Sequence, residues 1–212
     1  MLSIIIPAYN EEKRLPEALD RTLKYLKNRK IKNEIIIVAD KSKDRTLGVV
    51  QEYTKKFKNV YYIYNPKKQG KGHAVRKGIL ASKGSLVLFI DADTSTPITE
   101  LDKFLPKIKN YDIVIGSREH KDSDVKKKLI SRVVLGNMGN ILLRIFLIKR
   151  VRDTQCGFKL FRGNIARELF SLSRINGFGF DFEIIFLAQK KRYKIKEMPV
   201  NWIYCEGTKV TW

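Results

Sequence analysis

Short apolar runs alternate with amphipathic segments along the first half of the 212-residue chain. The apolar runs are typical of buried strands, and they cover residues 2–7, 34–39, 60–64, 86–90 and 112–115. Apolar positions three and four residues apart predict helices between them, over residues 11–27, 46–57, 72–81 and 98–108. Strands that are apolar throughout and separated by helices indicate an α/β fold with a mostly parallel central sheet covered on both faces.

The second half of the chain is less regular and predicts an α+β arrangement. Residues 123–148 are first basic and then apolar, which predicts a helix. Further on, the pattern predicts strands over 153–161 and 195–200 and helices over 164–170 and 181–190. We expect this half to lie along one edge of the first, within a single domain, because the length fits one domain.

Composition narrows the kind of protein and the kind of partner. An apolar content of 43% excludes a mainly disordered chain. The two cysteines have no CxxC spacing, so a disulfide framework is excluded and a reducing, intracellular setting is expected. The 43 Lys and Arg exceed the 22 Asp and Glu by 21. This charge predicts an anionic partner: nucleic acid, a phosphorylated small molecule or an anionic membrane surface.

The basic residues are concentrated in one stretch. Residues 118–152 contain ten Lys or Arg against three Asp or Glu, interleaved with aliphatic side chains. Such a run is most often solvated surface, but the aliphatic residues favour an interfacial helix on an anionic membrane. Nucleic acid is the competing partner, although the helix offers aliphatic rather than aromatic side chains for stacking on bases. Arg132 and Arg144 make it a poor membrane-spanning helix, and the short run 2–7 lacks the basic start of a signal peptide.

Two aspartates, Asp91 and Asp93, directly follow the strand predicted over 86–90. Ligands of open α/β sheets bind outside the carboxyl ends of strands. Two carboxylates one residue apart can hold one hard divalent cation, which in turn binds phosphate oxygens. Asp is also common in turns; in a basic α/β protein we favour the metal site.

Polar loops follow two other predicted strands. Asp40 ends the strand over 34–39 and precedes any plausible helix cap, so we interpret it as a ligand of a nucleotide base or ribose, and Asp44 as the cap. Gly70-Lys71-Gly72 leads into a helix, where glycines allow close approach of a phosphate and Lys71 adds charge. A flexible basic turn explains this motif equally well, and His73 is interpreted as a packing residue.

Carboxylates in the second half remain open on spacing alone. Asp153 opens the segment Asp153-Thr154-Gln155-Cys156-Gly157-Phe158-Lys159, and Asp181 and Glu183 follow a Gly-Phe-Gly-Phe segment. Each of these carboxylates is compatible with a helix cap or a general base.

Several of these motifs together resemble glycosyltransferase family 2, the inverting enzymes of the GT-A fold. Residues 4–11, IIIPAYNE, resemble its opening strand and nucleotide loop. Residues 38–46, VADKSKDRT, resemble its V-D-D-G-S-x-D-x-T segment, with Ala39 and Lys41 as departures. Residues 65–74 resemble N-x-G-K-G-x-A, and Asp91-Ala92-Asp93 matches the D-x-D metal motif. The resemblance implies a Rossmann-like GT-A sheet and a nucleotide-sugar site in residues 1–117, formed by Pro7, Tyr9, Glu11, Asp40, Lys71, Asp91, Ala92 and Asp93.

Within that family the chain resembles the polyprenyl-phosphate sugar synthases. Ser117-Arg118 and Ser131-Arg132 are similar to their paired arginines near the lipid phosphate. Residues 153–161, DTQCGFKLF, resemble the dolichyl-phosphate glucosyltransferase branch, and residues 199–210 its late segment. This implies that residues 118–212 form the acceptor half, with an interfacial helix at about 123–148. It implies acceptor-phosphate ligands Arg118, Ser131, Arg132 and Lys209, and catalytic roles for Asp93, Arg118, Arg132 and Asp181, the last orienting the donor sugar or an arginine.

The resemblance implies transfer of glucose from UDP-glucose to a dolichyl or polyprenyl phosphate, with inversion and with Mg²⁺ or Mn²⁺ on Asp91 and Asp93. The expected location is the cytoplasmic face of a membrane, as a peripheral protein. A GDP-mannose-dependent mannosyl enzyme is the first alternative. The others are a transferase acting on a sugar hydroxyl, which would need Asp181 as base, and a nucleic-acid-binding module. Nothing in the pattern indicates an oligomeric state.

Overall fold

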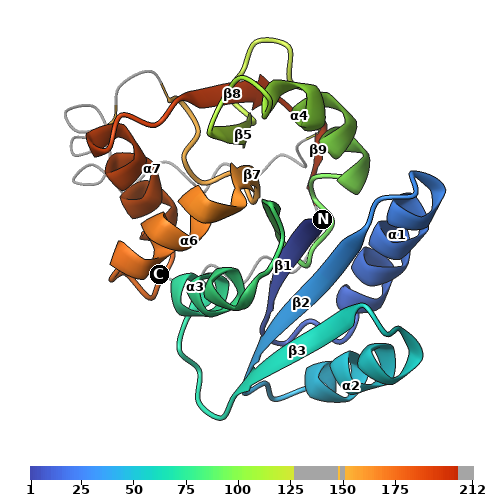
Figure 1. Cartoon of the computed structure of the whole chain (residues 1–212). Coiled ribbons are helices and arrows are strands. Elements are labelled where there is room, and N and C mark those ends of the chain that lie inside the picture. Colours follow the sequence, from blue (N-terminus) through green and yellow to red (C-terminus); the bar gives the residue numbers. More distant parts are fainter. Residues whose placement is uncertain (127–147, 149–150, 205–212) are drawn as a thin grey trace.

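The computed structural model describes residues 1–126, 148 and 151–204, and its centre is one seven-stranded sheet (Figure 1). The strand order is β3-β2-β1-β4-β7-β5-β8. Every neighbouring pair is parallel except those that β7 forms with β4 and β5. The prediction of a mostly parallel central sheet is therefore confirmed. The strands are β1 (Leu2–Ala8), β2 (Asn33–Asp40), β3 (Val60–Asn65), β4 (Leu86–Ile90), β5 (Ile113–Ser117), β7 (Phe158–Arg162) and β8 (Ile195–Pro199).

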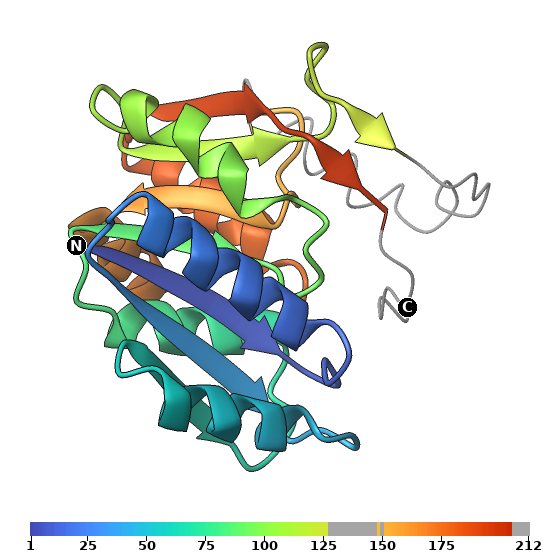
Figure 2. The ribbon, with the colours of Figure 1, turned by 90° about the vertical axis from the view of Figure 1, so that its right-hand side faces the viewer.

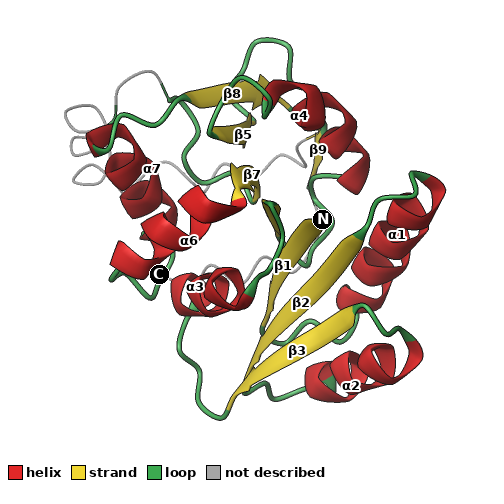
Figure 3. Cartoon of the chain, viewed as in Figure 1, coloured by secondary structure: helices red, strands yellow, loops and turns green. Residues whose placement is uncertain are grey.

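Helices cover both faces of this sheet (Figure 3). Alternate residues of β1 show why: Ile4 and Ile6 belong to one buried cluster, whereas Ile5 belongs to another. The first cluster includes residues of α1, α2 and α4, and the second includes residues of α3, α6 and α7. A strand buried on both faces has no polar side, which is the cause of its continuous apolar run. The helices are α1 (Leu15–Asn28), α2 (Thr46–Lys56), α3 (Lys71–Ala81), α4 (Leu101–Lys107), α6 (Gly163–Leu172) and α7 (Phe180–Lys190), with a 3-10 turn η1 (Ile98–Glu100).

Strand β7 corrects the expectation that the second half lies along one edge of the first. It inserts between β4 and β5, so that Lys159 is paired with Phe89 on one side and with Ile115 on the other. The strand predicted over 153–161 begins only at Phe158. Because β7 runs antiparallel to β4, the residues that precede it lie at the carboxyl end of β4. This topology brings residues 153–157 to the strand end that carries Asp91.

A second, two-stranded sheet pairs β6 (Val125–Lys126) in parallel with β9 (Trp202–Ile203). It lies beside the carboxyl ends of the main strands (Figure 2), where the Ile203 amide donates to the Ser95 carbonyl at 2.8 Å. The helix predicted from residue 123 is wrong at its start, because residues 125–126 form strand β6 and pair with β9. Residues 127–147 lie outside the described part. Among the described residues, no helix combines the length and the apolar character needed to cross a membrane.

Candidate active site

The carboxyl end of β4 carries the centre of the site. Asp91 follows β4 directly. Its Oδ1 forms an ion pair at 2.6 Å with Nζ of Lys71, which is the first residue of α3. Lys71 Nζ and Lys159 Nζ lie 5.4 and 5.5 Å from the centroid of the Phe89 ring. The structure thus brings together two of the predicted nucleotide-sugar ligands, Lys71 and Asp91, which are twenty positions apart in sequence.

Asp91 packs directly on the segment that precedes β7. Its amide donates to the Gly157 carbonyl at 3.1 Å. A Cβ atom on residue 157 would lie 1.9 Å from Asp91 Oδ2, far inside van der Waals contact. Residue 157 therefore has to be glycine if Asp91 is to keep this position.

The two carboxylates fit a divalent cation. Among the described residues there is no cluster of three or more His, Cys, Asp or Glu side chains able to hold a metal by themselves. Mg²⁺ and Mn²⁺ sites that serve phosphates commonly use one or two carboxylates, and phosphate and water oxygens complete the shell. Asp91 and Asp93 supply that set of hard oxygen donors. Thr94, a β-branched residue, has a φ of 58°, and such strain concentrates at functional sites.

Asp40 organises the loop before α3. Its buried carboxylate accepts hydrogen bonds from Asn65 Nδ2 at 2.7 Å and from the amides of Gln69 and Gly70 at 2.9 and 3.0 Å. These three bonds use most of the acceptor capacity of the Asp40 carboxylate. The predicted contact of Asp40 with a base or ribose stays a prediction. Asp44 accepts from the Thr46 amide, the first of α2, but it stands one residue before the N-cap position, which Arg45 occupies, so the predicted cap is displaced by one residue.

The glycines of Gly70-Lys71-Gly72 have a packing reason. Gly70 has a φ of 100°, and a Cβ there would lie 2.5 Å from the Asn176 carbonyl oxygen. A Cβ on Gly72 would lie 2.4 Å from the Ile175 carbonyl oxygen. The small residues let the chain at 175–177 close against the start of α3. The sequence left Glu183 as either a helix cap or a general base. In the structure its carboxylate accepts hydrogen bonds from the Arg174 and Ile175 amides at 2.8 and 2.9 Å and so holds that segment in place.

The remaining predicted donor ligands lie at the ends of β1 and β4. Pro7 is paired with Val38 inside the sheet, and Ala92 is buried. Lys68 Nζ lies 4.6 Å from the centroid of the Tyr9 ring. Glu11 lies in the turn before α1, which begins at Leu15 rather than at residue 11, and its carboxylate pairs with Arg14 at 2.6 Å.

Arg118, the residue that follows β5, forms an ion pair with the buried Asp153. Its Nε and Nη2 donate to the two oxygens of Asp153 at 2.7 and 2.9 Å, and its amide donates to Oδ2 at 2.9 Å. Burial would raise the pKa of Asp153, but the hydrogen bonds and charge of Arg118 outweigh it and hold that pKa below its usual range. Binding of an acceptor phosphate by Arg118 stays a prediction. Ser131, Arg132 and Lys209, predicted to share that role, lie outside the described residues.

Lys159 is a site residue that the sequence reading missed. It is 1% exposed, and its Nζ donates to Asp181 Oδ1 at 2.5 Å and to the Cys156 carbonyl at 2.6 Å. Burial raises the pKa of Asp181, and the ammonium groups of Lys159 and Lys71 oppose that rise. A lysine between Phe158 and Leu160 in a buried strand signals a buried ion pair, but the sequence does not say with which carboxylate. Asp181 is thus a paired charge rather than an isolated base.

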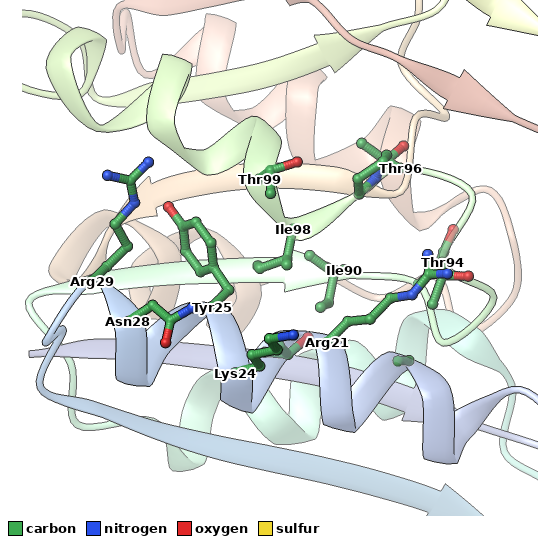
Figure 4. Close-up of a pocket in the computed structure, with 14 residues that line it drawn as sticks. Arg21, Lys24, Tyr25, Asn28, Arg29, Ile90, Thr94, Thr96, Ile98 and Thr99 are labelled. Carbon is green, nitrogen blue, oxygen red and sulfur yellow. The ribbon is translucent and has the colours of Figure 1, made fainter.

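A pocket of about 530 Å³ opens between α1 and residues 94–99 (Figure 4). Arg21 and Lys24 of α1 lie on one wall, and Thr94 and Thr99 lie on the other. Of the predicted donor ligands, the pocket contacts Asp91. It therefore flanks the carboxylate site rather than enclosing the residues at the end of β1.

Comparison with known proteins identifies the kind of molecule that carries this site. A model of glycosyl transferase family 2 matches residues 3–170. A dolichyl-phosphate beta-glucosyltransferase of Dictyostelium discoideum is 41% identical over 223 residues, which cover 99% of this chain and 68% of the relative. The human protein of the same name is 36% identical over 224 residues, which cover 99% of this chain and 69% of the relative. Each relative is longer than this chain.

Solved structures share the fold at much lower identity. Glucosyl-3-phosphoglycerate synthase from Mycobacterium tuberculosis, in complex with Mg²⁺ and UDP, has a TM-score of 0.72 at 15% identity and covers 99% of this chain and 73% of its own. A mannosyltransferase from Pyrobaculum calidifontis, in complex with GDP-Man and Mn²⁺, has a TM-score of 0.61 at 16% identity and covers 99% and 58%. These likenesses establish the GT-A fold. With a family model over most of its length and relatives matching it almost end to end, this chain belongs to glycosyltransferase family 2.

Proposed function

We propose that this glycosyltransferase moves glucose from UDP-glucose to the phosphate of a dolichyl or related polyprenyl phosphate, with inversion at the anomeric carbon. The observation that carries the proposal is the identity of 36% to 41%, over 99% of the chain, with relatives named dolichyl-phosphate beta-glucosyltransferase. The geometry at Asp91 supports it, because residue 157 of the DTQCGFK segment lies against that carboxylate.

The chemistry needs positioning and charge more than proton transfer. A phosphate oxygen of the acceptor forms the new bond to the anomeric carbon, while the bond from that carbon to the UDP oxygen breaks and UDP leaves. The acceptor oxygen is already ionised at neutral pH, so no proton has to be removed. The pairing of Asp181 with Lys159 fits this requirement, because the Lys159 ammonium already occupies one oxygen of that carboxylate.

Asp91 and Asp93 would hold Mg²⁺ or Mn²⁺, which supplies positive charge for the diphosphate leaving group. Lys71 lies within 2.6 Å of Asp91 and adds a cation at the same strand end. Arg118 would bind the acceptor phosphate. Its pair with Asp153 uses Nε and Nη2, and a guanidinium carries five N–H donors in all. In this arrangement the protein stabilises charge at both ends of the transfer.

We place the protein on the cytoplasmic face of a membrane as a peripheral protein. Support comes from the excess of basic over acidic residues between 118 and 152, which suits an anionic lipid surface. The lipid chain of the acceptor requires that the site face such a surface.

Incubation with labelled UDP-glucose, Mn²⁺ and dolichyl phosphate is expected to give a labelled lipid that is extracted into organic solvent. GDP-mannose in place of UDP-glucose is the control for the mannosyl alternative, and a sugar alcohol in place of the lipid tests a hydroxyl acceptor. Product with GDP-mannose only, or with the hydroxyl acceptor only, would replace the proposal by that alternative. No lipid product with any nucleotide sugar would refute it.

Replacing Asp93 with alanine is expected to remove metal-dependent binding of UDP, because one of the two carboxylates for the cation is lost. Calorimetric titration of UDP with and without Mn²⁺ measures this dependence. Asp122→Ala is the matched control, since the Asp122 side chain is 63% exposed and pairs with His120. Unchanged Mn²⁺ dependence in Asp93→Ala would contradict the role of Asp93.

A further inference from the structure

We propose that Lys71 couples the binding of the divalent cation to the binding of the nucleotide by exchanging its partner, from the Asp91 carboxylate to the donor diphosphate. This inference rests on the proposed function, because it assumes a nucleotide-sugar donor and a cation on Asp91 and Asp93. It adds a coupling between the two ligands. Binding of the cation frees Lys71 for the nucleotide, and binding of the nucleotide draws Lys71 away from Asp91.

The first step of the argument is competition at one carboxylate. Asp91 Oδ1 accepts the Lys71 ammonium at 2.6 Å. Asp91 Oδ2 faces Gly157 so closely that a Cβ there would lie 1.9 Å away. The face of Oδ2 toward residue 157 is therefore closed, and Oδ1 is shared. A divalent cation that binds Asp91 competes with Lys71 for the same carboxylate.

The second step is that Lys71 can move while its backbone cannot. Gly70 and Gly72 fit closely against the chain at 175–177, which fixes the start of α3. The Lys71 ammonium lies 5.4 and 5.7 Å from the ring centroids of Phe89 and Phe178, and the side chain is 19% exposed. A lysine reaches new partners by rotating its flexible four-carbon chain. Exchange therefore needs only a rotation of this side chain.

The third step is the charge of the cluster. The carboxylates of Asp91, Asp93 and Asp181 all attract the Lys71 ammonium electrostatically. Lys159 is the second ammonium group, but it is held by Asp181 and the Cys156 carbonyl and has no such freedom. Three carboxylates and two ammonium groups leave one net negative charge, which a divalent cation would invert. A diphosphate then restores the balance, and the released Lys71 ammonium becomes available to it.

Coupling of this kind is reciprocal. If the cation raises the affinity for UDP by some factor, UDP raises the affinity for the cation by the same factor. In the wild-type protein, Mn²⁺ that binds alone must displace the Lys71 ammonium from Asp91 and leave it without that partner. When UDP binds as well, the displaced ammonium pairs with the diphosphate of UDP. The exchange predicts strong positive coupling that depends on residue 71.

The test is the binding of Mn²⁺ and of UDP to Lys71→Met, without any turnover. Mn²⁺ alone is expected to bind Lys71→Met about 10-fold more tightly than wild type, since a hydrogen bond to a charged group is lost from the competitor. UDP with saturating Mn²⁺ is expected to bind about 10-fold more weakly, and the coupling factor falls accordingly. Titration calorimetry and the electron paramagnetic resonance signal of free Mn²⁺ measure these constants.

Lys68→Met separates exchange from general electrostatics. It removes the same charge from the loop before α3, where Lys68 lies over the Tyr9 ring rather than on Asp91. Its affinity for Mn²⁺ alone should stay within about 2-fold of wild type, because exposed charges are screened over about 10 Å. An equal tightening in Lys68→Met, or none in Lys71→Met, would overturn the exchange while leaving the donor site and the proposed function intact. A wild-type protein that binds neither Mn²⁺ nor UDP would overturn both.

Discussion

Gly157→Ala is expected to lower glucosyl transfer by about 100-fold, because a displacement of reacting groups of about 1 Å has that effect. The new Cβ would lie 1.9 Å from Asp91 Oδ2, so either the carboxylate or the chain at residue 157 must move. Both movements act on the carboxylate assigned to the cation. Metal-dependent UDP binding should weaken with the rate, and titration of UDP in the presence of Mn²⁺ measures it.

Gly48→Ala is the matched control for this substitution. Gly48 lies in α2, and a Cβ there meets nothing within 4 Å. Alanine is favoured over glycine in a helix by about 0.5–1 kcal/mol, so this variant should be as stable as wild type or slightly more so. Gly157→Ala with wild-type UDP affinity and transfer rate would show that the contact with Asp91 does not position that carboxylate.

Lys159→Met is expected to lower the free energy of unfolding by about 3–5 kcal/mol, because it leaves the Asp181 carboxylate buried and unpaired. For a chain of this length each kcal/mol shifts the melting temperature by about 2–4 °C. Thermal and urea unfolding measure the loss. The control is Lys191→Met, which breaks an exposed pair with Glu168 and should change stability by less than about 1 kcal/mol.

The double variant Lys159→Met/Asp181→Asn tests the cause of that loss. With both charges removed, most of the stability should return, because replacing a whole buried pair costs far less than breaking it. The same reasoning applies to Asp181→Asn alone, which leaves Lys159 unpaired and destabilises the protein whether or not Asp181 acts on the acceptor. A double variant no more stable than Lys159→Met would show that the lysine acts through its packing and its bond to Cys156.

Local patterns predicted most elements, and particular residues show why. β4 was predicted over 86–90 and is observed over the same residues. The helix predicted over 46–57 is α2, and Asp44 bonds to its first amide from one residue before the N-cap. Hydrophobic periodicity and capping are properties of neighbouring residues, so they can be read without knowing the rest of the chain. The start of α1 was missed because Glu11 lies in a turn of its own before the helix.

Long-range partners could not be predicted in the same way. Lys159 stands in a strand whose neighbours, β4 and β5, are more than forty residues away in sequence, and the pattern placed that strand at an edge. Arg118 was assigned to a phosphate, and the structure gives it a buried carboxylate as well. Which charge meets which depends on how the whole sheet is ordered. Residue identity alone leaves that order open.

The sequence by itself determined the α/β class and the two carboxylates at the end of a central strand, and its motifs carried the resemblance to glycosyltransferase family 2. Apolar periodicity and strand-end chemistry are local, so they survive in a single sequence. Only the tertiary structure decided that β7 runs antiparallel to its neighbours in the sheet and that Gly157 lies against Asp91. It also decided that Lys71 pairs with Asp91 and Lys159 with Asp181. The physical reason is that buried charges take their partners from whatever the packed fold brings within about 3 Å, and no local propensity encodes that distance.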